Sequence, residues 1–426
     1  MTENPSVAAG SVTLESMIQR HARQLVVEAI QDSRVALLVG PRQAGKTTLV
    51  GQIADHELPM SQVTLDHAGT RRLAQADPIG FIAGLELPAA IDEVHRAPEL
   101  LLEIKRVVDR DPTPGRFLLT GSARVLSLPK VADALVGRAQ SVTLWPLSQA
   151  ELEGSRRNLV DELFAGSSPA VESAELGQEG WVRRALRGGF AEACARAEGR
   201  SRDTWFASYL ETLVQRDIRD LAEIRALDEV PALLALVAAR AAAPANFANL
   251  ASELRISEAS VRRYLALLEA AFISHRVPAW RRSLGRRATA TPKLQLVDSG
   301  LAAHLLGIDA SRLRGDPALG GNLLESFVRM ELVKLASTSD AQPRLHHLRT
   351  RTGSEVDAVL ERRGGEIVAI EVKASATPSP SDFKGLKELR DTRPDHFRAG
   401  IVLHPGSQTL PFGDRLWATP LSALWR

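Results

Sequence analysis

The sequence predicts an α/β protein that starts with a parallel β-sheet, continues through a helical region and ends in a second α/β unit. The prediction rests on a strand, glycine loop and helix over residues 35–54, on strands that alternate with helical segments to about residue 150, and on alternating apolar strands over residues 345–373. Strands that alternate with helices are typical of a parallel sheet covered by helices.

Composition narrows the class of protein. Of the 426 residues, 44% are hydrophobic and 24% are charged, which is typical of a soluble globular protein of two to four domains. The net charge is only +2, so any basic surface for a nucleic acid must be local. The one cysteine, Cys194, excludes an internal disulfide framework and a cysteine-rich zinc site. We expect a cytoplasmic protein without a signal peptide or a membrane span.

The first motif is a glycine loop between an expected strand, Val35–Val39, and an expected helix, Thr48–Ala54. It fits the phosphate-binding pattern G-x-x-x-x-G-K-[ST], in which backbone N–H groups and a helix N-terminus surround phosphate oxygens. Lys46 is predicted to reach the β- and γ-phosphates, and the Thr47 hydroxyl to hold Mg²⁺. The predicted nucleotide-binding residues are Gly40, Pro41, Arg42, Gln43, Ala44, Gly45, Lys46, Thr47 and Thr48.

Two acids follow the short apolar strand Ala89–Ile91. In P-loop ATPases the first acid of such a pair supports Mg²⁺ and the second polarises the attacking water, so we assign these roles to Asp92 and Glu93. The chain has no Asn-Lys-x-Asp stretch of the kind that reads guanine, and ATP is therefore favoured over GTP.

Further candidates lie on and beyond the next strand, Phe117–Thr120. Thr120 or Ser122 is predicted to sense the γ-phosphate from the strand end. Arg138 is a candidate arginine finger that neutralises charge on the transferring phosphoryl group, and the alternative is an ordinary surface arginine. Two more strands, Val63–Leu65 and Val142–Leu144, complete the expected sheet.

Residues 226–290 have a different character. Two short helices are expected at Phe247–Leu254 and Glu258–Ala271, capped by Asn246 and Ser257 and followed by the strand Phe272–Val277. This order indicates a winged helix-turn-helix whose second helix docks on DNA.

Basic side chains concentrate in this region, and they predict contacts to DNA phosphates. The alternatives are a module that contacts protein and a solvated charged face. The nucleic-acid candidates are Ser260, Arg262, Arg263, Arg281, Arg282, Arg286 and Arg287, with Arg276 and Lys293 in the same positive cluster.

Carboxylates form the last constellation. In the expected strand Ile367–Lys373, Glu371 and Lys373 point the same way because side chains alternate, and Asp357 lies on a neighbouring strand. Asp357, Glu371 and Lys373 match the PD-(D/E)xK nuclease pattern, with Glu325 on an upstream helix as a further acid. Metal-assisted phosphodiester hydrolysis needs such groups, with Glu325, Asp357 and Glu371 as metal ligands. The alternative is a scaffold that binds DNA or protein without cutting.

Taken in order, these motifs resemble a group of prokaryotic ATPases. Members pair an AAA-type P-loop domain with a C-terminal domain of unknown function, itself a winged helix followed by a restriction-endonuclease-like α/β fold. The motifs that carry the resemblance are Gly40–Thr48, Ile91–Val94, Leu119–Ala123, Arg216–Ile218, Val261–Leu268, Leu296–Leu301, Arg349–Asp357 and Glu371–Lys373.

The resemblance implies ATP binding with Mg²⁺, hydrolysis, and AAA-like homo-oligomerisation. One departure is His95, where the group often has glutamine. We expect an ATPase that acts on or with DNA, and the alternative is a nucleotide-controlled switch without nuclease activity. The expected divisions are a tail (1–10), the P-loop domain (11–150), a helical lid (151–225), the winged helix (226–290) and the nuclease-like domain (291–426).

Overall fold

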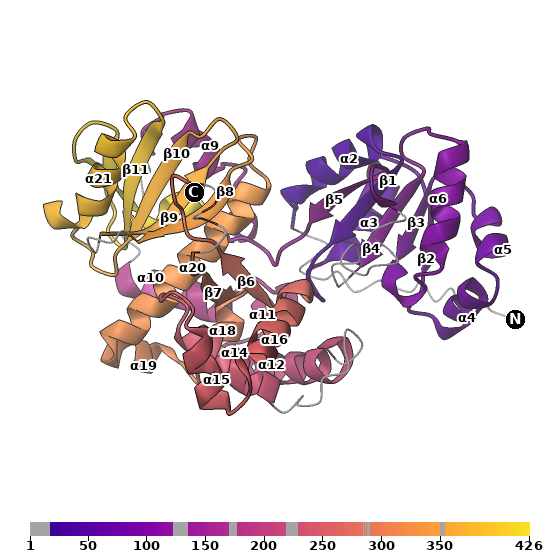
Figure 1. Ribbon diagram of the computed structural model, residues 1–426, viewed down its shortest axis with the longest axis horizontal. Helices are drawn as coiled ribbons and strands as arrows, with labels where there is room; N and C mark the ends of the chain where they lie inside the picture. The colour runs from indigo at the N-terminus through magenta and orange to yellow at the C-terminus, as the bar shows by residue number, and fades with distance from the viewer. Residues whose placement is uncertain are drawn as a thin grey trace, which may run out of the picture.

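The computed structural model describes residues 18–121, 135–169, 177–218, 229–283, 285, 287, 290–349 and 354–426. An N-terminal sheet with its helices lies beside a helical body and a C-terminal sheet body (Figure 1). The long helix α20, Pro317–Ser337, runs between the helical body and the C-terminal sheet.

The N-terminal sheet has five strands in the order β2-β3-β4-β1-β5, and every neighbouring pair is parallel. The predicted parallel sheet is confirmed, with β4 inserted between the loop-bearing strand β1 and the acid-bearing strand β3. All residues of β1 are buried because helices cover both faces. The strands are β1 (Val35–Val39), β2 (Ser61–Thr64), β3 (Ala89–Asp92), β4 (Phe117–Gly121) and β5 (Ala139–Thr143).

Alternate side chains of this sheet enter different cores. Ala36 and Leu38 pack with α2 and α3, whereas Val35, Leu37 and Val39 pack with α4, α5 and α6. The helices are α2 (Ala22–Asp32), α3 (Lys46–His56), α4 (Ala68–Ala76), α5 (Pro78–Ala83) and α6 (Leu100–Arg110), with the short turn η1 (Val94–Arg96) after β3.

The predicted helix pair of the middle region is confirmed. Asn246 accepts a hydrogen bond from the Asn249 amide at 3.0 Å and Ser257 accepts one from the Ser260 amide at 3.0 Å, so each caps its helix as expected. Strands β6 and β7 follow as an antiparallel pair. The elements are α8 (Gln149–Leu152), α9 (Leu159–Phe164), α10 (Gly177–Arg187), α11 (Ala191–Cys194), α12 (Arg200–Thr212), η3 (Leu213–Ile218), α14 (Glu229–Ala239), α15 (Phe247–Leu254), α16 (Glu258–Ala270), β6 (Ser274–Val277), β7 (Lys293–Leu296), α18 (Ser299–Leu305) and α19 (Ala310–Gly315).

The C-terminal body is a six-stranded mixed sheet in the order β12-β13-β11-β10-β9-β8. Helix α20 covers one face of it and α21 the other. Its elements are β8 (Arg344–Arg349), β9 (Glu355–Glu361), β10 (Ile367–Val372), η4 (Pro380–Phe383), α21 (Lys384–Thr392), β11 (Phe397–His404), β12 (Leu410–Pro411), β13 (Leu416–Pro420) and η5 (Leu421–Leu424).

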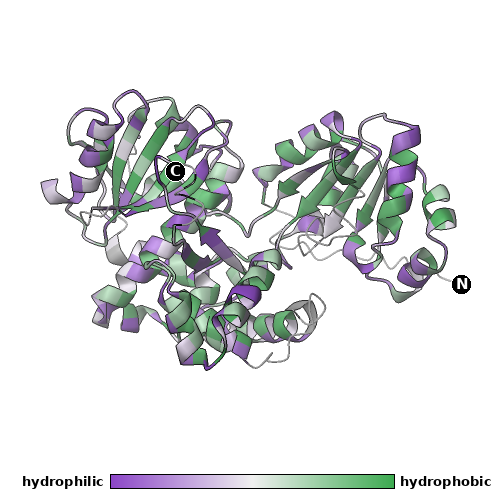
Figure 2. Ribbon diagram, in the orientation of Figure 1, coloured by the Kyte–Doolittle hydropathy of each residue, from purple (hydrophilic) through white to green (hydrophobic). Residues whose placement is uncertain are grey.

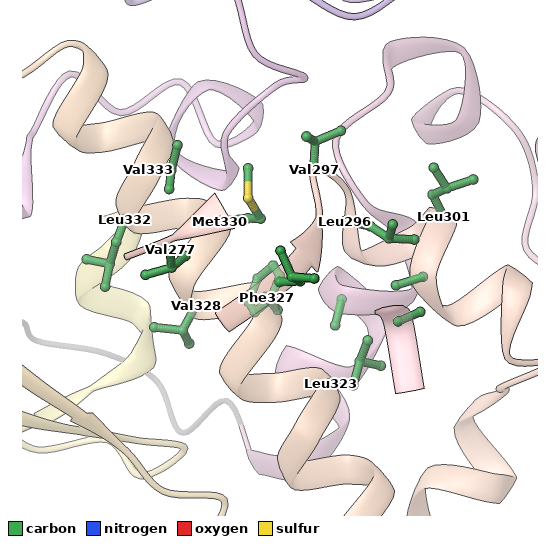
Figure 3. Close-up of a cluster of buried hydrophobic side chains, with 14 of the residues drawn as sticks. Val277, Leu296, Val297, Leu301, Leu323, Phe327, Val328, Met330, Leu332 and Val333 are labelled. Atoms are coloured by element: carbon green, nitrogen blue, oxygen red, sulfur yellow. The ribbon is translucent and has the colours of Figure 1, made fainter. Parts of the chain in front are cut away.

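One apolar core joins the helical body to the C-terminal sheet. Phe327 and Met330 of α20 lie beside Val277 and Leu296 of the β6–β7 ribbon (Figure 3). Helix α9, from the segment predicted as a lid, packs on α20, β10 and β11. Part of that segment therefore belongs to the C-terminal body.

Apolar residues concentrate on the strands of both sheets, and polar residues on the outer helix faces (Figure 2). Among the described residues, no helix combines the length and the apolarity that a bilayer crossing requires.

Candidate functional site

The glycine loop turns sharply between β1 and α3. Gly40, Gln43 and Gly45 have positive φ values of 155°, 57° and 89°. A Cβ atom on Gly40 would lie 2.1 Å from the Leu144 carbonyl oxygen, so only glycine fits against the segment that follows β5. Gly45 is the N-cap residue of α3, which places the first amides of that helix at the loop.

Lys46, the first residue of α3, lies inside this loop and is only 5% exposed. Its Nζ donates to the carbonyl oxygens of Gly40 at 3.1 Å and Pro41 at 2.9 Å. The loop therefore holds a buried ammonium where the motif predicts a phosphate-binding lysine.

Hydroxyl groups from neighbouring elements contact the Asp92 carboxylate at the carboxyl ends of the strands. Its two carboxylate oxygens each lie 3.2 Å from the Thr47 hydroxyl, and one accepts from the Thr120 hydroxyl at 2.5 Å. Thr64 on β2 donates to the same carboxylate at 3.3 Å. Hydroxyl and carboxylate oxygens suit Mg²⁺, so Thr47 and Asp92 fit a magnesium site.

Glu93 follows Asp92 with a left-handed backbone, φ 58° and ψ 44°. Its amide donates to the Thr120 hydroxyl at 3.0 Å, and its carboxylate lies 3.0 Å from His95 Nδ1. Burial acts to raise the pKa of Glu93, but the contact with His95 and the charges of His95, Lys46 and Arg42 outweigh it and bring the pKa to about 2. The carboxylate is therefore ionised at neutral pH.

The structure does not bring Arg138 to the nucleotide site of its own chain. Arg138 precedes β5, and its carbonyl accepts from the Val35 amide where β1 begins, at the sheet edge opposite the glycine loop. Its guanidinium donates to both carboxylate oxygens of Asp109, at 2.5 and 2.9 Å. This position does not fit an arginine finger for the nucleotide site of the same chain, and a finger that acts across a subunit boundary stays a prediction. Ser122 lies outside the described residues.

Sequence reasoning missed Arg20 and Glu151, which lie behind the loop. Arg20 donates to the Ala44 carbonyl at 2.6 Å, to the Trp145 carbonyl at 2.7 Å and to Glu151 at 3.0 Å. Glu151 belongs to a capping box with Ser148, a Ser-x-x-Glu signal visible in the sequence. No local pattern marks Arg20, because its partners are distant along the chain.

Asp357, Glu371 and Lys373 lie close together, on and just beyond the paired strands β9 and β10. Asp357 on β9 accepts from the Val372 amide at 2.9 Å, and Lys373 donates to Glu371 at 2.7 Å. Burial, with the charges of Glu325 and Glu371, raises the pKa of Asp357 well above its usual value. Burial also raises the pKa of Glu371. Burial acts to lower the pKa of Lys373, but the charge of Glu371 and its hydrogen bond outweigh this effect and raise the pKa of the lysine.

The Glu325 carboxylate already pairs with two cationic side chains of the same chain. Lys293 donates to it at 2.7 Å, and Arg329 also donates to it. Lys293, predicted in the exposed positive cluster, is 4% exposed and belongs to this buried group instead. Within the part of the chain that the structure describes, no three His, Cys, Asp or Glu side chains are grouped to hold a metal ion.

The basic candidates differ in their exposure to solvent. Arg262, Arg263 and Arg282 are exposed, and Ser260 is half-buried beside the Ser257 hydroxyl. The guanidinium of Arg262 also pairs with Glu258 at 2.6 Å.

Arg287 and Arg281 have partners elsewhere in the chain. Arg287 donates to Glu361 at 2.9 Å and lies 5.3 Å from the Trp280 ring centre. Arg281 donates to the Arg349 carbonyl at 2.5 Å. Arg286 lies outside the described residues.

Family models match most of the chain in sections. A model described as an AAA domain matches residues 32–153, so this section is similar to AAA domains. Two models described as domains of unknown function match residues 178–312 (DUF8612) and 320–424 (DUF4143).

Known proteins are similar over long stretches. Uncharacterized proteins of Mycobacterium tuberculosis and Mycobacterium bovis are each 29% identical over 429 residues, covering 98% of this chain and 87% of theirs. Among solved structures, the Walker-type ATPase PABY2304 of Pyrococcus abyssi is 16% identical, with 67% of this chain and 94% of that chain covered and a TM-score of 0.40. The RuvB Holliday junction branch migration motor of Thermotoga maritima is 20% identical, with coverage of 62% and 92% and a TM-score of 0.31.

Proposed function

We propose that this chain binds ATP with Mg²⁺ at the loop Gly40–Thr48 and hydrolyses it. One observation carries the proposal: the Thr47 hydroxyl lies 3.2 Å from the carboxylate of Asp92, next to a buried Lys46 inside the glycine loop. These are the groups that a nucleoside triphosphate and its cation require, and they lie at the carboxyl ends of β1 and β3, on either side of β4 in the parallel sheet.

The side chains then have distinct roles. Lys46 exchanges the carbonyl oxygens of Gly40 and Pro41 for β- and γ-phosphate oxygens, while loop amides bind the remaining oxygens. Thr47 and Asp92 hold Mg²⁺, which neutralises phosphate charge when bound. Glu93 accepts a hydrogen bond from the attacking water and orients it, since its carboxylate stays ionised at neutral pH.

Phosphate release by the purified full chain tests this proposal. We expect Glu93→Gln to reduce turnover by about 10²- to 10⁴-fold while ATP still binds, because the water loses its acceptor. Glu103→Gln, which removes an acid that pairs with Arg106 on α6, is the matched control and should keep normal turnover. Normal hydrolysis by Glu93→Gln would show that another group orients the water.

We also propose DNA as a partner of the middle region. Helices α15 and α16 with the β6–β7 ribbon have the element order of a winged helix, and the exposed arginines 262 and 263 lie on its second helix. Because Arg287 pairs with Glu361 and Lys293 pairs with Glu325, helix α16 is a better candidate for the DNA contact than the β6–β7 ribbon.

Metal-dependent phosphodiester cleavage is a second candidate function, favoured by the convergence of Asp357, Glu371 and Lys373. The fit to a metal is incomplete because Lys293 and Arg329 neutralise Glu325, so we derive no step through a metal there. Plasmid incubated with the protein and Mg²⁺ or Mn²⁺ tests the candidate, with Asp357→Asn as control. Loss of cutting in the variant supports it, and no cutting by the wild type favours a nucleotide-controlled binding switch.

A further inference from the structure

A buried arginine supports the glycine loop from behind. Arg20 is 7% exposed, and its planar guanidinium donates in three directions, to Ala44, Trp145 and Glu151. The 2.6 Å hydrogen bond to the Ala44 carbonyl fixes a peptide in the middle of the loop. Glu151 also accepts from the His21 amide at 2.8 Å, so the Arg20 side chain and the amide of the next residue donate to the same carboxylate.

The segment 145–151, which follows β5 and includes most of α8, is held on its other side by helix α20. Lys334 donates to the Leu147 carbonyl at 3.0 Å, and the Gln149 amide donates to Glu331 at 2.7 Å. Glu331 and Lys334 also pair with each other at 2.7 Å. The segment therefore lies between Arg20 at the loop and two charged residues of α20.

This segment has little room to move. The Leu147 amide donates to the Gly189 carbonyl at 2.8 Å, and a Cβ atom on Gly189 would lie 2.1 Å from the Leu147 carbonyl oxygen. Glu151, Glu331 and Lys334 are all less than 9% exposed. Breaking one partner of such buried pairs leaves an uncompensated charge, so their arrangement is strongly specified.

We propose that Arg20 is a positioning residue of the nucleotide site, and that the contacts Arg20–Glu151 and Gln149–Glu331 form a relay from the loop to α20. The inference rests on the proposed ATP site. Because α20 also carries Glu325 of the carboxylate cluster, the relay joins the two sites through one rigid helix. Coupling through discrete packed contacts of this kind is reciprocal between the sites it joins.

The ATP dissociation constant of the full chain with Mg²⁺, measured by titration calorimetry, tests the relay. Arg20→Lys keeps the charge but cannot reach three acceptors, and Glu151→Gln removes one anionic acceptor. We expect each to raise the dissociation constant roughly tenfold, as for a hydrogen bond to a charged group. The dissociation constant of the double variant should exceed that of either single variant by no more than about twofold, since both changes break the same relay.

Glu331→Gln separates positioning from mere support of the fold, because Glu331 reaches the loop through the segment 145–151. We expect it to weaken ATP binding severalfold, whereas Glu153→Gln, which breaks a nearby pair with Arg184, should not. Equal binding by Glu331→Gln and this control overturns the relay, as does wild-type affinity in Arg20→Lys. If Arg20→Lys fails to fold, Glu331→Gln carries the test. Wild-type protein that binds no ATP overturns the proposed function itself.

Discussion

At the scale of single residues, the nucleotide site is shaped by side chains that hold one another. Glu93 has a left-handed backbone, which costs free energy in a residue with a Cβ atom. The hydrogen bond that its backbone amide donates to the Thr120 hydroxyl and its contact with His95 compensate for that cost and set the direction of the carboxylate. His95 is thus a partner of the proposed water-orienting group.

Replacing His95 tests this assignment. His95→Ala removes the contact that fixes the Glu93 carboxylate, so we expect turnover to fall roughly tenfold with little change in the Michaelis constant for ATP. His95→Gln keeps an N–H donor and should restore most of the rate. Steady-state phosphate release distinguishes these outcomes. A raised Michaelis constant with unchanged turnover would instead place His95 in ATP binding.

Glu151 predicts a pH-dependent stability. Burial acts to raise its pKa, but Arg20 and the backbone amides outweigh it and lower the pKa from the usual 4.5. The stability from Glu151 is therefore fully present above pH 4.5 and is lost as pH falls through the lowered pKa. Glu151→Gln should cost about 3 kcal/mol or more at pH 7, since Arg20 stays buried without its anion.

Urea unfolding of the wild type and Glu151→Gln at several pH values measures this difference. We expect the gap in unfolding free energy to narrow as the solution is acidified below pH 4.5. A gap that widens on acidification would mean that Glu151 is not ionised in the folded protein.

At the scale of elements, α20 packs against both the helical body and the C-terminal sheet. Phe327 is 1% exposed and lies in the core that both bodies share. Phe327→Ala should therefore cost about 3–5 kcal/mol and lower the stability of both bodies together. Leu73→Ala on α4, at a side chain that is 67% exposed, is the control and should change little. Denaturation followed by tryptophan fluorescence and by circular dichroism measures these changes. A loss of stability in only one of the two bodies would contradict the shared core.

Much of this architecture could be predicted from local patterns. β1 was predicted with its observed bounds because a parallel strand buried on both faces is a continuous apolar run. Asn246 and Ser257 marked the starts of α15 and α16 because their side chains replace missing helix hydrogen bonds. The position of Arg138 could also have been inferred, since a residue that precedes a parallel strand lies at the edge opposite the loop.

Contacts between distant segments could not be predicted in this way. Arg20 meets Glu151 across 131 positions, and Lys293 meets Glu325 across 32. A lysine in a cluster of arginines has the same local pattern whether it faces DNA or a buried acid, and only the packing of β7 on α20 decides between them.

At the scale of the whole molecule, DNA binding is expected to depend on α16. Replacing Arg262 and Arg263 together by alanine should weaken duplex binding and reduce the slope of affinity against salt by about two, one for each phosphate contact. The matched control is the double alanine variant of Arg71 and Arg72, adjacent arginines on α4 beside the N-terminal sheet. Fluorescence anisotropy over a range of salt concentrations gives both slopes. Equal slopes for the two double variants would exclude α16 as the DNA contact.

A calorimetric titration of ATP with Mg²⁺ tests directly whether the glycine loop is an ATP site. We predict saturable binding at one site per wild-type chain and a loss of at least about 100-fold in Lys46→Ala, whose ammonium no longer meets the phosphates. Indistinguishable titrations of the two proteins, or no heat of binding from the wild type, would contradict it.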